Sequence, residues 1–199
     1  YVCRANPDLG PDVLAAKVYR PRRFRSLRND ALYRHGRVVL DDEGKELHDD
    51  RALHAIAKGT AIGKQLQHVS WMAHELATLE MLHDAGADVP RPVASGPNVI
   101  LMEYIGDMHR PAPTLNEVTL TAAEAKPHFQ RVLDNIELML SLRRVHGDLS
   151  AYNLLYWDGR ITLIDFPQVV DPYENPAARA VFERDVRRMH PLAARVRID

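Results

Sequence analysis

The 199-residue sequence predicts an α+β protein with two lobes: a small β-rich N-terminal lobe that carries one key helix, and a mostly helical C-terminal lobe. Two observations predict this class. Apolar runs of strand length and one long helical pattern fill the first half of the chain. The second half holds further helical patterns around a single hairpin signal. We therefore divide the chain into residues 1–105 and 106–199.

The strands expected in the first lobe are short. An apolar run at residues 13–19 predicts a strand that is interrupted by one charge, Lys17. A basic stretch, Arg20–Arg28, follows it and is typical of a solvated face, with a nucleic-acid or phosphate role left open. A turn at Pro97 and Asn98 precedes a second predicted strand at residues 99–104.

One long helix is expected between these strands. A charged, weakly periodic stretch at residues 41–63 predicts a mobile surface segment. From residue 64 to residue 85, apolar side chains recur at helical spacing, which predicts a helix with Glu75 beside its core stripe. The stripe consists of Leu66, Val69, Ala73, Leu76, Leu79 and Leu82.

The second lobe is expected to contain two helices and a hairpin. Thr121 and Glu124 have capping-box spacing at the start of a helical pattern at residues 121–144, although Pro127 favours a later start. Its apolar face comprises Phe129, Val132, Leu133, Ile136, Met139 and Leu140. Strands at 154–157 and 161–164 flank Asp158-Gly159, and a last helix should begin near Pro176 with Asn175 as its cap.

Composition narrows the classes of protein. The 26 Lys and Arg residues nearly balance 27 Asp and Glu residues, so the formal net charge of −1 gives no strong duplex-DNA signal. Cys3 is the only cysteine, which excludes an intramolecular disulfide and favours a reducing, cytoplasmic setting. No apolar run reaches the roughly 20 residues of a membrane-spanning helix, so we expect no membrane association.

Three polar residues near the predicted hairpin suggest phosphoryl transfer. Asp148 and Asn153 lie five residues apart before the hairpin, and Asp165 follows its second strand. Because a hairpin returns its ends to the same side, the three side chains can converge. One carboxylate could then serve the accepting nucleophile, while the amide and the other carboxylate could bind Mg²⁺, which needs few protein ligands.

A lysine and a glutamate complete the pattern. Lys17 places a charge in an apolar run, which is costly without a partner, and Glu75 is the best-placed partner. Together they could hold the α- and β-phosphates of a nucleotide. Each of these residues also has an ordinary structural interpretation as an edge lysine, a turn residue or a cap, but their joint order favours the functional one.

At these residues the sequence resembles the RIO family of atypical serine/threonine protein kinases, of the bacterial kind and close to the Rio1 branch. HGDLSAYNLLY (146–156) is similar to the catalytic loop of that family, and ITLIDFPQVV (161–170) to its metal loop. Further similar segments are AAKVYR (15–20), LYRHGR (32–37), WMAHE (71–75), ILMEYIG (100–106) and RPAP (110–113). The resemblance extends from Tyr1 to about Asp185.

The resemblance implies a two-lobed protein-kinase-like fold and an ATP-dependent phosphotransferase. The γ-phosphate would pass to serine, as in a non-specific serine/threonine kinase, or transiently to Asp165, as in an ATPase. Asp148 and Asp165 would be catalytic, Asn153 and Asp165 would bind Mg²⁺ or Mn²⁺, and Lys17 would pair with Glu75. Met102, Glu103, Tyr104 and Ile105 would line the adenine pocket. The implied partners are ATP, an unidentified protein substrate (the protein itself included) and a ribosome-related partner.

Two alternatives stay open. Aminoglycoside and choline kinases also have a glycine before the catalytic aspartate, as Gly147 precedes Asp148 here. By that resemblance the protein would be a small-molecule phosphotransferase. The phosphate-covering loop of the RIO family would fall just before Tyr1, and its N-terminal extension is not part of this sequence. A chain without that loop could be a nucleotide-binding scaffold that no longer turns over ATP.

Overall fold

The computed structural model describes residues 1–4, 13–19, 32–33 and 35–195, without the side chains of residues 190–195. The basic stretch Arg20–Arg28 lies outside the described residues. The elements are β1 (Val2–Arg4), β2 (Val13–Val18), α2 (Asp50–Ala57), α3 (Ala61–Asp84), β3 (Pro92–Gly96), β4 (Val99–Glu103), α4 (Ala122–Ser141), the 3₁₀ turn η3 (Ala151–Asn153), β5 (Leu154–Trp157), β6 (Arg160–Leu163) and α5 (Ala178–Arg195).

A four-stranded antiparallel sheet forms the first layer of the molecule, with strand order β1-β2-β4-β3. The central pair β2–β4 places Lys17 opposite Ile100 and lies close to the predicted strands. Sequence analysis did not predict β1 or β3 as strands. β1 has only three residues, and β3 contains Pro92 and Gly96, which strands disfavour. The α+β class is confirmed.

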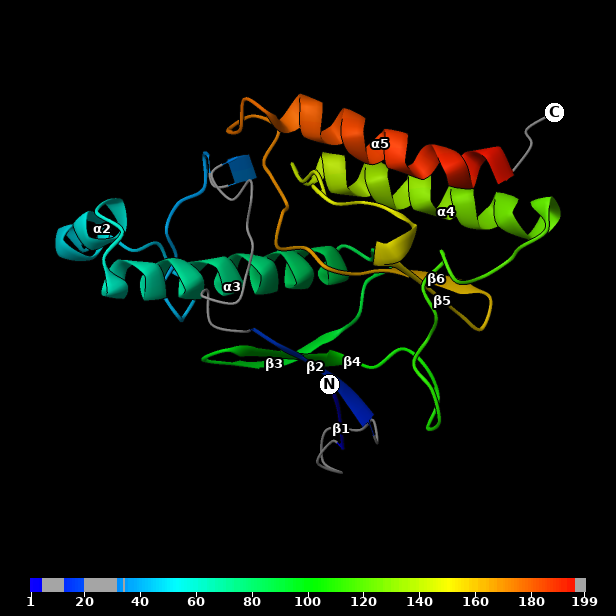
Figure 1. Cartoon of the computed structure of the whole chain (residues 1–199), viewed down its shortest axis with the longest axis horizontal. Coiled ribbons are helices and arrows are strands. Elements are labelled where there is room, and N and C mark those ends of the chain that lie inside the picture. Colours follow the sequence, from blue (N-terminus) through cyan, green and yellow to red (C-terminus); the bar gives the residue numbers. More distant parts are fainter. Residues whose placement is uncertain (5–12, 20–31, 34, 196–199) are drawn as a thin grey trace.

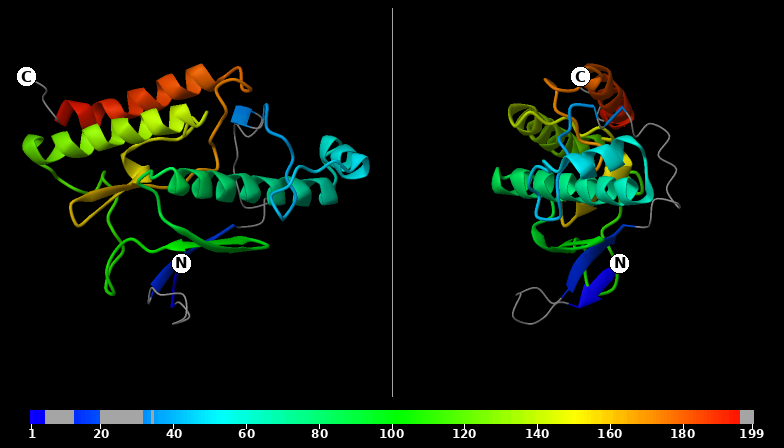
Figure 2. Two further views of the ribbon diagram at one scale, coloured as in Figure 1. Left: turned by 180° about the vertical axis from the view of Figure 1, so that it is seen from behind. Right: turned by 90° about the vertical axis from the view of Figure 1, so that its left-hand side faces the viewer.

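The helices form two further layers over this sheet. Figures 1 and 2 show α3 crossing one face of the sheet, with α4 and α5 lying side by side beyond it. The β5–β6 hairpin lies beyond the C-terminal end of α3 and below α4 in the view of Figure 1. This arrangement brings the strand that carries Lys17, the helix that carries Glu75 and the hairpin ends to one region. The division at residues 105 and 106 stays a prediction.

One apolar core runs through all three layers. It joins side chains of the sheet and of α3, such as Ile100 and Leu82, to side chains of α4 and the hairpin, such as Val132 and Leu163. These four residues are essentially inaccessible to solvent. Burial of this much apolar surface is the main force that holds the layers together.

The buried face of α3 differs in part from the prediction. Leu79 and Leu82 are buried as expected, and Met72 and Glu75 join them. The other four side chains of the predicted stripe, Leu66, Val69, Ala73 and Leu76, line a groove of about 680 Å³ beside the turn between β3 and β4. The periodicity therefore identified the helix, but of its predicted stripe only Leu76, Leu79 and Leu82 contact the core cluster.

Helix α2 lies within residues 41–63, for which the sequence predicted a mobile surface segment. Asp49 caps the helix by accepting hydrogen bonds from the amides of Arg51 and Ala52. None of its residues is buried, so the expected surface position is correct. It packs closely on α3, because a Cβ at Gly63 would lie 2.0 Å from the carbonyl oxygen of Ala55.

Helix α4 confirms the capping box but not the later start. Thr121 accepts from the amide of Glu124, and the Glu124 carboxylate accepts from the amide of Thr121, so the helix begins at Ala122. Pro127 lies inside the helix. Its missing N–H leaves a carbonyl in the first turn free, and that turn is exposed to water, which makes the loss tolerable.

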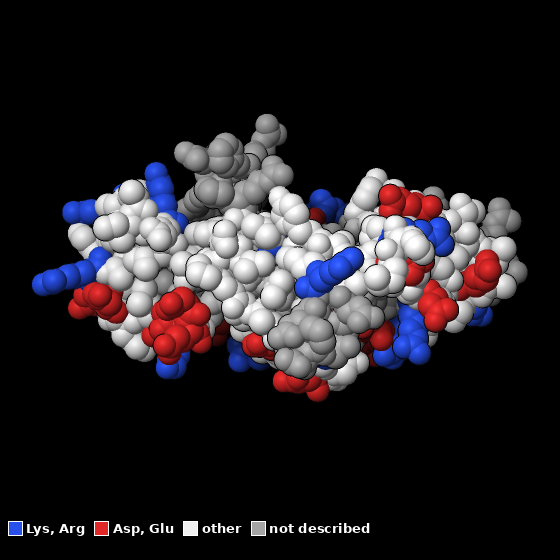
Figure 3. All heavy atoms as spheres, turned by 90° about the horizontal axis from the view of Figure 1, so that it is seen from below, with Lys and Arg blue, Asp and Glu red and all other residues white. Residues whose placement is uncertain are grey.

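The molecular surface carries mixed charge. Figure 3 shows Lys, Arg, Asp and Glu side chains of both signs scattered over the described part of the sheet side. Neither sign forms a broad patch among the described residues on that face, as a formal net charge of −1 suggests. Within the described ranges, the helices are too short or too polar to cross a membrane.

Candidate active site

Lys17 joins three elements of the fold. Its Nζ donates hydrogen bonds to Glu75 Oε1 on α3 and to Asp165 Oδ1 after β6. The other oxygen of Glu75, Oε2, accepts a hydrogen bond from the Tyr19 hydroxyl. Glu75 is only 3% exposed, and both of its carboxylate oxygens have hydrogen-bond donors, as burial of a polar group requires.

The charge of Lys17 is maintained by its partners. Burial alone would lower the pKa of this lysine, but the Glu75 and Asp165 carboxylates outweigh that effect and raise the pKa above its usual value. Lys17 is therefore an ammonium ion at every physiological pH. An ammonium ion between a helix and the segment after the hairpin can attract an anionic group such as a phosphate.

Asp148 and Asn153 contact each other within the loop of residues 146–153. The Asn153 Nδ2 group donates to the Asp148 carbonyl oxygen at 2.8 Å and to its Oδ2 at 3.3 Å. Both of these contacts with Asp148 use the Nδ2 group, so the Asn153 Oδ1 atom is not occupied by Asp148. The loop meets the hairpin exit where the Ile164 amide donates to the Asn153 carbonyl at 3.0 Å. This bond places Asn153 next to Asp165 in the fold.

His146 links the same two segments from inside the protein. Its Nδ1 accepts from the Asp148 amide at 3.3 Å, and its Nε2 lies 3.2 Å from the Ile164 carbonyl oxygen. Burial lowers the pKa of His146 to about 4, so the ring is neutral at pH 7. Because Nδ1 accepts a hydrogen bond, the neutral ring carries its proton on Nε2, which donates to the Ile164 carbonyl oxygen. His146 therefore orients the loop by hydrogen bonds.

Helix α5 holds the loop from the other side, which sequence analysis missed. Asp185 is 2% exposed, and its Oδ2 accepts from the Gly147 amide at 2.8 Å. Arg184 donates to the Gly147 carbonyl oxygen, and Arg188 donates to Asp148 Oδ1. A signal was present for Asp185, because it shares helical spacing with the buried Val181 and Met189, and a carboxylate on an apolar face needs a partner.

The backbone at Asp165 is unusual. Its φ of +72° lies in the left-handed region, which non-glycine residues adopt rarely and often at functional sites. The chain after it is anchored at Pro167, whose carbonyl oxygen accepts from Trp71 Nε1 at 2.9 Å and from Arg37 Nη2 at 3.0 Å. These contacts fix the direction in which the Asp165 side chain leaves the backbone.

The four residues expected to line an adenine pocket lie at the end of β4. Met102 packs against the core. Glu103 and Arg91 share two hydrogen bonds: the Glu103 amide donates to the Arg91 carbonyl oxygen, and the Arg91 amide donates to Glu103 Oε2. The Ile105 carbonyl oxygen accepts from the Ala112 amide at 2.9 Å, and Tyr104 lies between these residues. The contacts fix the exit of the strand, and the adenine contact itself stays a prediction.

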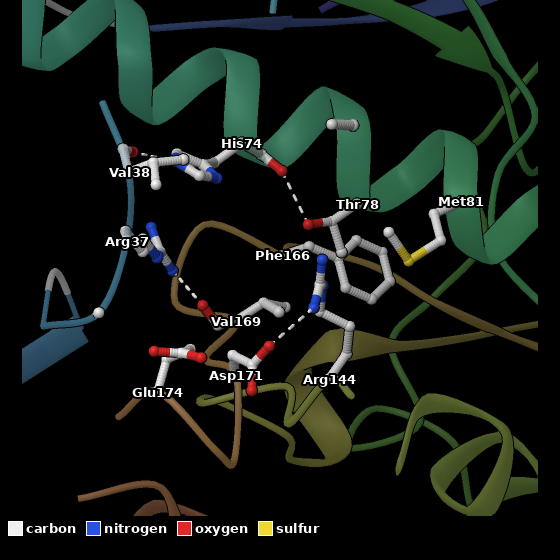
Figure 4. Close-up of a pocket in the computed structure, with 12 residues that line it drawn as sticks. Arg37, Val38, His74, Thr78, Met81, Arg144, Phe166, Val169, Asp171 and Glu174 are labelled. Carbon is white, nitrogen blue, oxygen red and sulfur yellow. Dashed lines mark hydrogen bonds and ion pairs between the residues drawn. The ribbon is translucent and has the colours of Figure 1, made fainter. Parts of the chain in front are cut away.

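A pocket of about 180 Å³ lies between α3 and the segment that follows Asp165 (Figure 4). Phe166 forms part of its wall, and His74 faces it from α3. Burial lowers the pKa of His74, whose Nε2 lies 2.8 Å from the Val38 carbonyl oxygen. The pocket contains two guanidinium groups and two carboxylates, contributed by Arg37, Arg144, Asp171 and Glu174.

The donor set near the hairpin exit fits a magnesium ion. Asp165 offers carboxylate oxygens and Asn153 offers an amide oxygen, which are the hard ligands that Mg²⁺ prefers. No group of three or more His, Cys, Asp and Glu side chains suited to a metal occurs in the described part of the chain. A site with two protein ligands agrees with this, because Mg²⁺ usually completes its shell with water and phosphate oxygens.

The predicted site residues therefore form two linked groups. Lys17 contacts both Glu75 and Asp165, and Asp148 contacts Asn153. Each of the two aspartate carboxylates has a cationic partner, Lys17 for Asp165 and Arg188 for Asp148. The roles assigned to these residues stay predictions.

Comparison with known proteins identifies the family. A family model described as the RIO domain matches residues 31–198, so the chain belongs to the RIO domain family. The α+β architecture agrees with this assignment.

The relatives of this chain include Rio1 proteins. The chain is 38% identical over 122 residues to "RIO-type serine/threonine-protein kinase Rio1" of Haloferax volcanii, which covers 59% of this chain and 40% of the relative. It is 34% identical over 116 residues to the protein of the same name in Thermoplasma acidophilum, which covers 58% of this chain and 59% of the relative. It is 30% identical over 156 residues to "Serine/threonine-protein kinase RIO1" of Homo sapiens, which covers 77% of this chain and 27% of the relative. The chain therefore spans 27% to 59% of the lengths of these relatives, and the predicted closeness to Rio1 is confirmed.

Proposed function

We propose that this protein is an Mg-ATP-dependent atypical serine/threonine kinase of RIO type, an ATPase of that type, or both. The observation that carries the proposal is the position of Lys17, which is held between Glu75 on α3 and Asp165 after the hairpin. A kinase needs this pair to hold the α- and β-phosphates next to a metal-binding aspartate. The names of the relatives support the same reaction class.

Asp148 is the proposed acceptor of the substrate proton. In the kinase reaction a serine hydroxyl attacks the γ-phosphorus, a new P–O bond forms, and the bond to the β-phosphate oxygen breaks to release ADP. The hydroxyl proton passes to the Asp148 carboxylate. Positioning and electrostatics account for most of the catalysis, because the phosphoryl group needs little covalent help from the protein.

Asp165 is proposed to have two roles. With Asn153 it would hold Mg²⁺, which when bound neutralises charge on the phosphates. In the ATPase cycle its carboxylate oxygen would attack the γ-phosphorus, release ADP and form an acyl phosphate that water then hydrolyses. Its left-handed backbone and its contact with Lys17 support a residue held in one orientation.

The remaining assignments follow from the same reaction. Met102, Glu103, Tyr104 and Ile105 would receive the adenine at the exit of β4, with the two lobes meeting at residues 105 and 106. The substrate is proposed to be a protein, this protein included. By family resemblance, we also propose a cytoplasmic location and a ribosome-related partner.

The test is labelling of the protein, produced with its native termini, by γ-³²P-ATP and Mg²⁺, followed by hydroxylamine. Hydroxylamine cleaves acyl phosphates and spares phosphoserine. We expect Asp165→Asn to abolish Mg-dependent turnover, and Asp148→Asn to reduce turnover while nucleotide binding is retained. Asp158→Asn is the matched control, because Asp158 lies at the hairpin turn away from the site.

Each result supports a different function. Hydroxylamine-sensitive label that is lost in Asp165→Asn supports the ATPase cycle, and stable label on serine supports a protein kinase. ATP consumption only after a small acceptor is added would replace the proposal with a small-molecule phosphotransferase. Binding without any turnover would replace it with a scaffold, and full activity in both aspartate variants would overturn the residue assignments.

A further inference from the structure

Helix α5 supplies Asp148 with a cation that its own loop does not contain. Residues 146–153 include no lysine and no arginine. The Nη1 atom of Arg188, forty residues further along the chain, donates to Asp148 Oδ1. Arg188 makes no other hydrogen bond or ion pair with the residues that the structure describes, so this contact is its single specific interaction there.

Two different elements thereby hold the two oxygens of one carboxylate. Arg188 on α5 contacts Oδ1, and Asn153 Nδ2 from η3 lies 3.3 Å from Oδ2. The Asp148 amide is fixed in addition by His146 at 3.3 Å. With the backbone and both oxygens restrained, the side chain is held in one rotamer, which a free aspartate on a loop would not keep.

The base of Arg188 is itself fixed relative to the loop. Asp185, one helical turn earlier, accepts from the Gly147 amide at 2.8 Å, and Arg184 donates to the Gly147 carbonyl oxygen. Arg184 also donates to the Tyr33 hydroxyl at 2.7 Å. Residues 184, 185 and 188 share one helical face, so a single turn of α5 holds both the loop backbone and the Asp148 side chain.

We propose that Arg188 is a positioning residue for the reaction, acting through Asp148. This inference rests on the proposed function, in which Asp148 takes the proton of the acceptor hydroxyl. Arg188 keeps the carboxylate turned toward the acceptor, so its removal affects the transfer step and leaves the nucleotide contacts of Lys17 intact. An error of about 1 Å in the position of a catalytic group can cost on the order of 100-fold in rate.

The experiment measures kcat, KM for ATP and nucleotide affinity in Arg188→Ala, with Arg187→Ala as control. Arg187 is the next residue on the same helix and pairs with Glu183 instead of the loop. We expect kcat to fall about 10- to 100-fold in Arg188→Ala, with KM and affinity for ATP unchanged. Arg187→Ala should keep the activity of the original protein. Arg188→Lys, or added ethylguanidinium with Arg188→Ala, should restore part of the lost rate.

A double variant shows whether the effect passes through Asp148. In the Asp148→Asn background, we expect Arg188→Ala to cause less than a 2-fold further change, because the two residues act as one unit. Unchanged or increased kcat in Arg188→Ala would overturn the proposal, as would an equal loss in Arg187→Ala. A full additional loss in the double variant, or no recovery with lysine or ethylguanidinium, would also overturn it. Absence of turnover in the original protein would instead overturn the proposed function and this inference with it.

Discussion

At the residue scale, His146 shows how burial sets the state of a titratable group. The ring packs against Phe166, with ring centroids 5.0 Å apart, and is 3% exposed. Its hydrogen bonds to the Asp148 amide and the Ile164 carbonyl need a neutral ring with the proton on Nε2. Protonation would put a second hydrogen on Nδ1, which then could not accept from Asp148. The loop geometry therefore depends on a neutral histidine.

We expect this histidine to make folding sensitive to mild acid. Its pKa is lowered from 6.5 to about 4, so between these values the unfolded chain binds a proton that the folded protein excludes. The shifted pKa of His146 has little effect on the free energy of unfolding above pH 6.5, and it lowers that free energy increasingly as the pH falls from 6.5 toward 4. Urea unfolding should show that the original protein loses about 3 kcal/mol more than His146→Asn between pH 7 and pH 4.

The control for this measurement is His109→Asn, because His109 is exposed in a loop. That variant should keep the pH dependence of the original protein. Parallel unfolding curves for the original protein and His146→Asn across this range would show that the ring is not held neutral by the fold.

Sequence reasoning succeeded for residues whose anomaly is local. Lys17 stands out as a charge within an apolar strand, and this indicated that it needs a partner such as Glu75. Arg188 gives no such signal, because arginine on a charged helix is ordinary and its contact with Asp148 spans forty residues. A contact of that kind depends on how α5 packs against the loop, which local patterns do not encode.

At the element scale, the loop of residues 146–153 depends on a glycine. Gly147 has φ of +83°, and a Cβ there would lie 2.1 Å from the carbonyl oxygen of Gln168. Two separate costs therefore oppose any side chain, one from the left-handed backbone and one from overlap with the neighbouring backbone. The amide and carbonyl of the same residue are the groups that α5 holds through Asp185 and Arg184.

Two glycine variants separate these costs. Gly159 has φ of +71° and no atom within 4 Å of the Cβ position, so Gly159→Ala should lose only about 1 kcal/mol from backbone strain. Gly147→Ala carries the same strain plus the clash, and we expect a loss of more than about 3 kcal/mol. Chemical denaturation of both variants checks this. Equal losses would mean that the segment around Gln168 moves away freely.

Elements with strong local signals were predicted well, and weaker ones were not. The β5–β6 hairpin and the capping box at Thr121 follow from local residue types, and both are confirmed. Helix α2 was missed because it is only eight residues long and lies within a charged stretch, although its apolar residues recur at helical spacing. β3 was missed because its stability comes from pairing with β4 across a register shift, and its own sequence is poor for a strand.

At the scale of the whole molecule, the apolar core crosses the predicted division at residues 105 and 106. Leu82 on α3 is fully buried in a cluster that also contains Val132 of α4 and Leu154 of β5. Because the same cluster stabilises both halves, neither half loses its packing alone. We infer that the described protein unfolds as one cooperative unit.

Leu82→Ala tests this cooperativity. Truncation at a fully buried site should cost about 2–5 kcal/mol, and the variant should still unfold in one transition. Leu133→Ala on the exposed side of α4 is the control and should cost less than about 1 kcal/mol. Tryptophan fluorescence and far-UV circular dichroism followed in urea should give coincident curves. Two separated transitions would mean that the halves unfold independently.

The paired contacts of Glu75 have a consequence for how α3 can move. Lys17 and Tyr19, which hold the two oxygens of Glu75, are two residues apart and so lie on the same face of the chain at the end of β2. A rotation of α3 about its own axis withdraws both oxygens together. Any change that withdraws Glu75 from the sheet therefore breaks two contacts between α3 and the chain at the end of β2 at once, and we expect the two contacts to form and break as one unit.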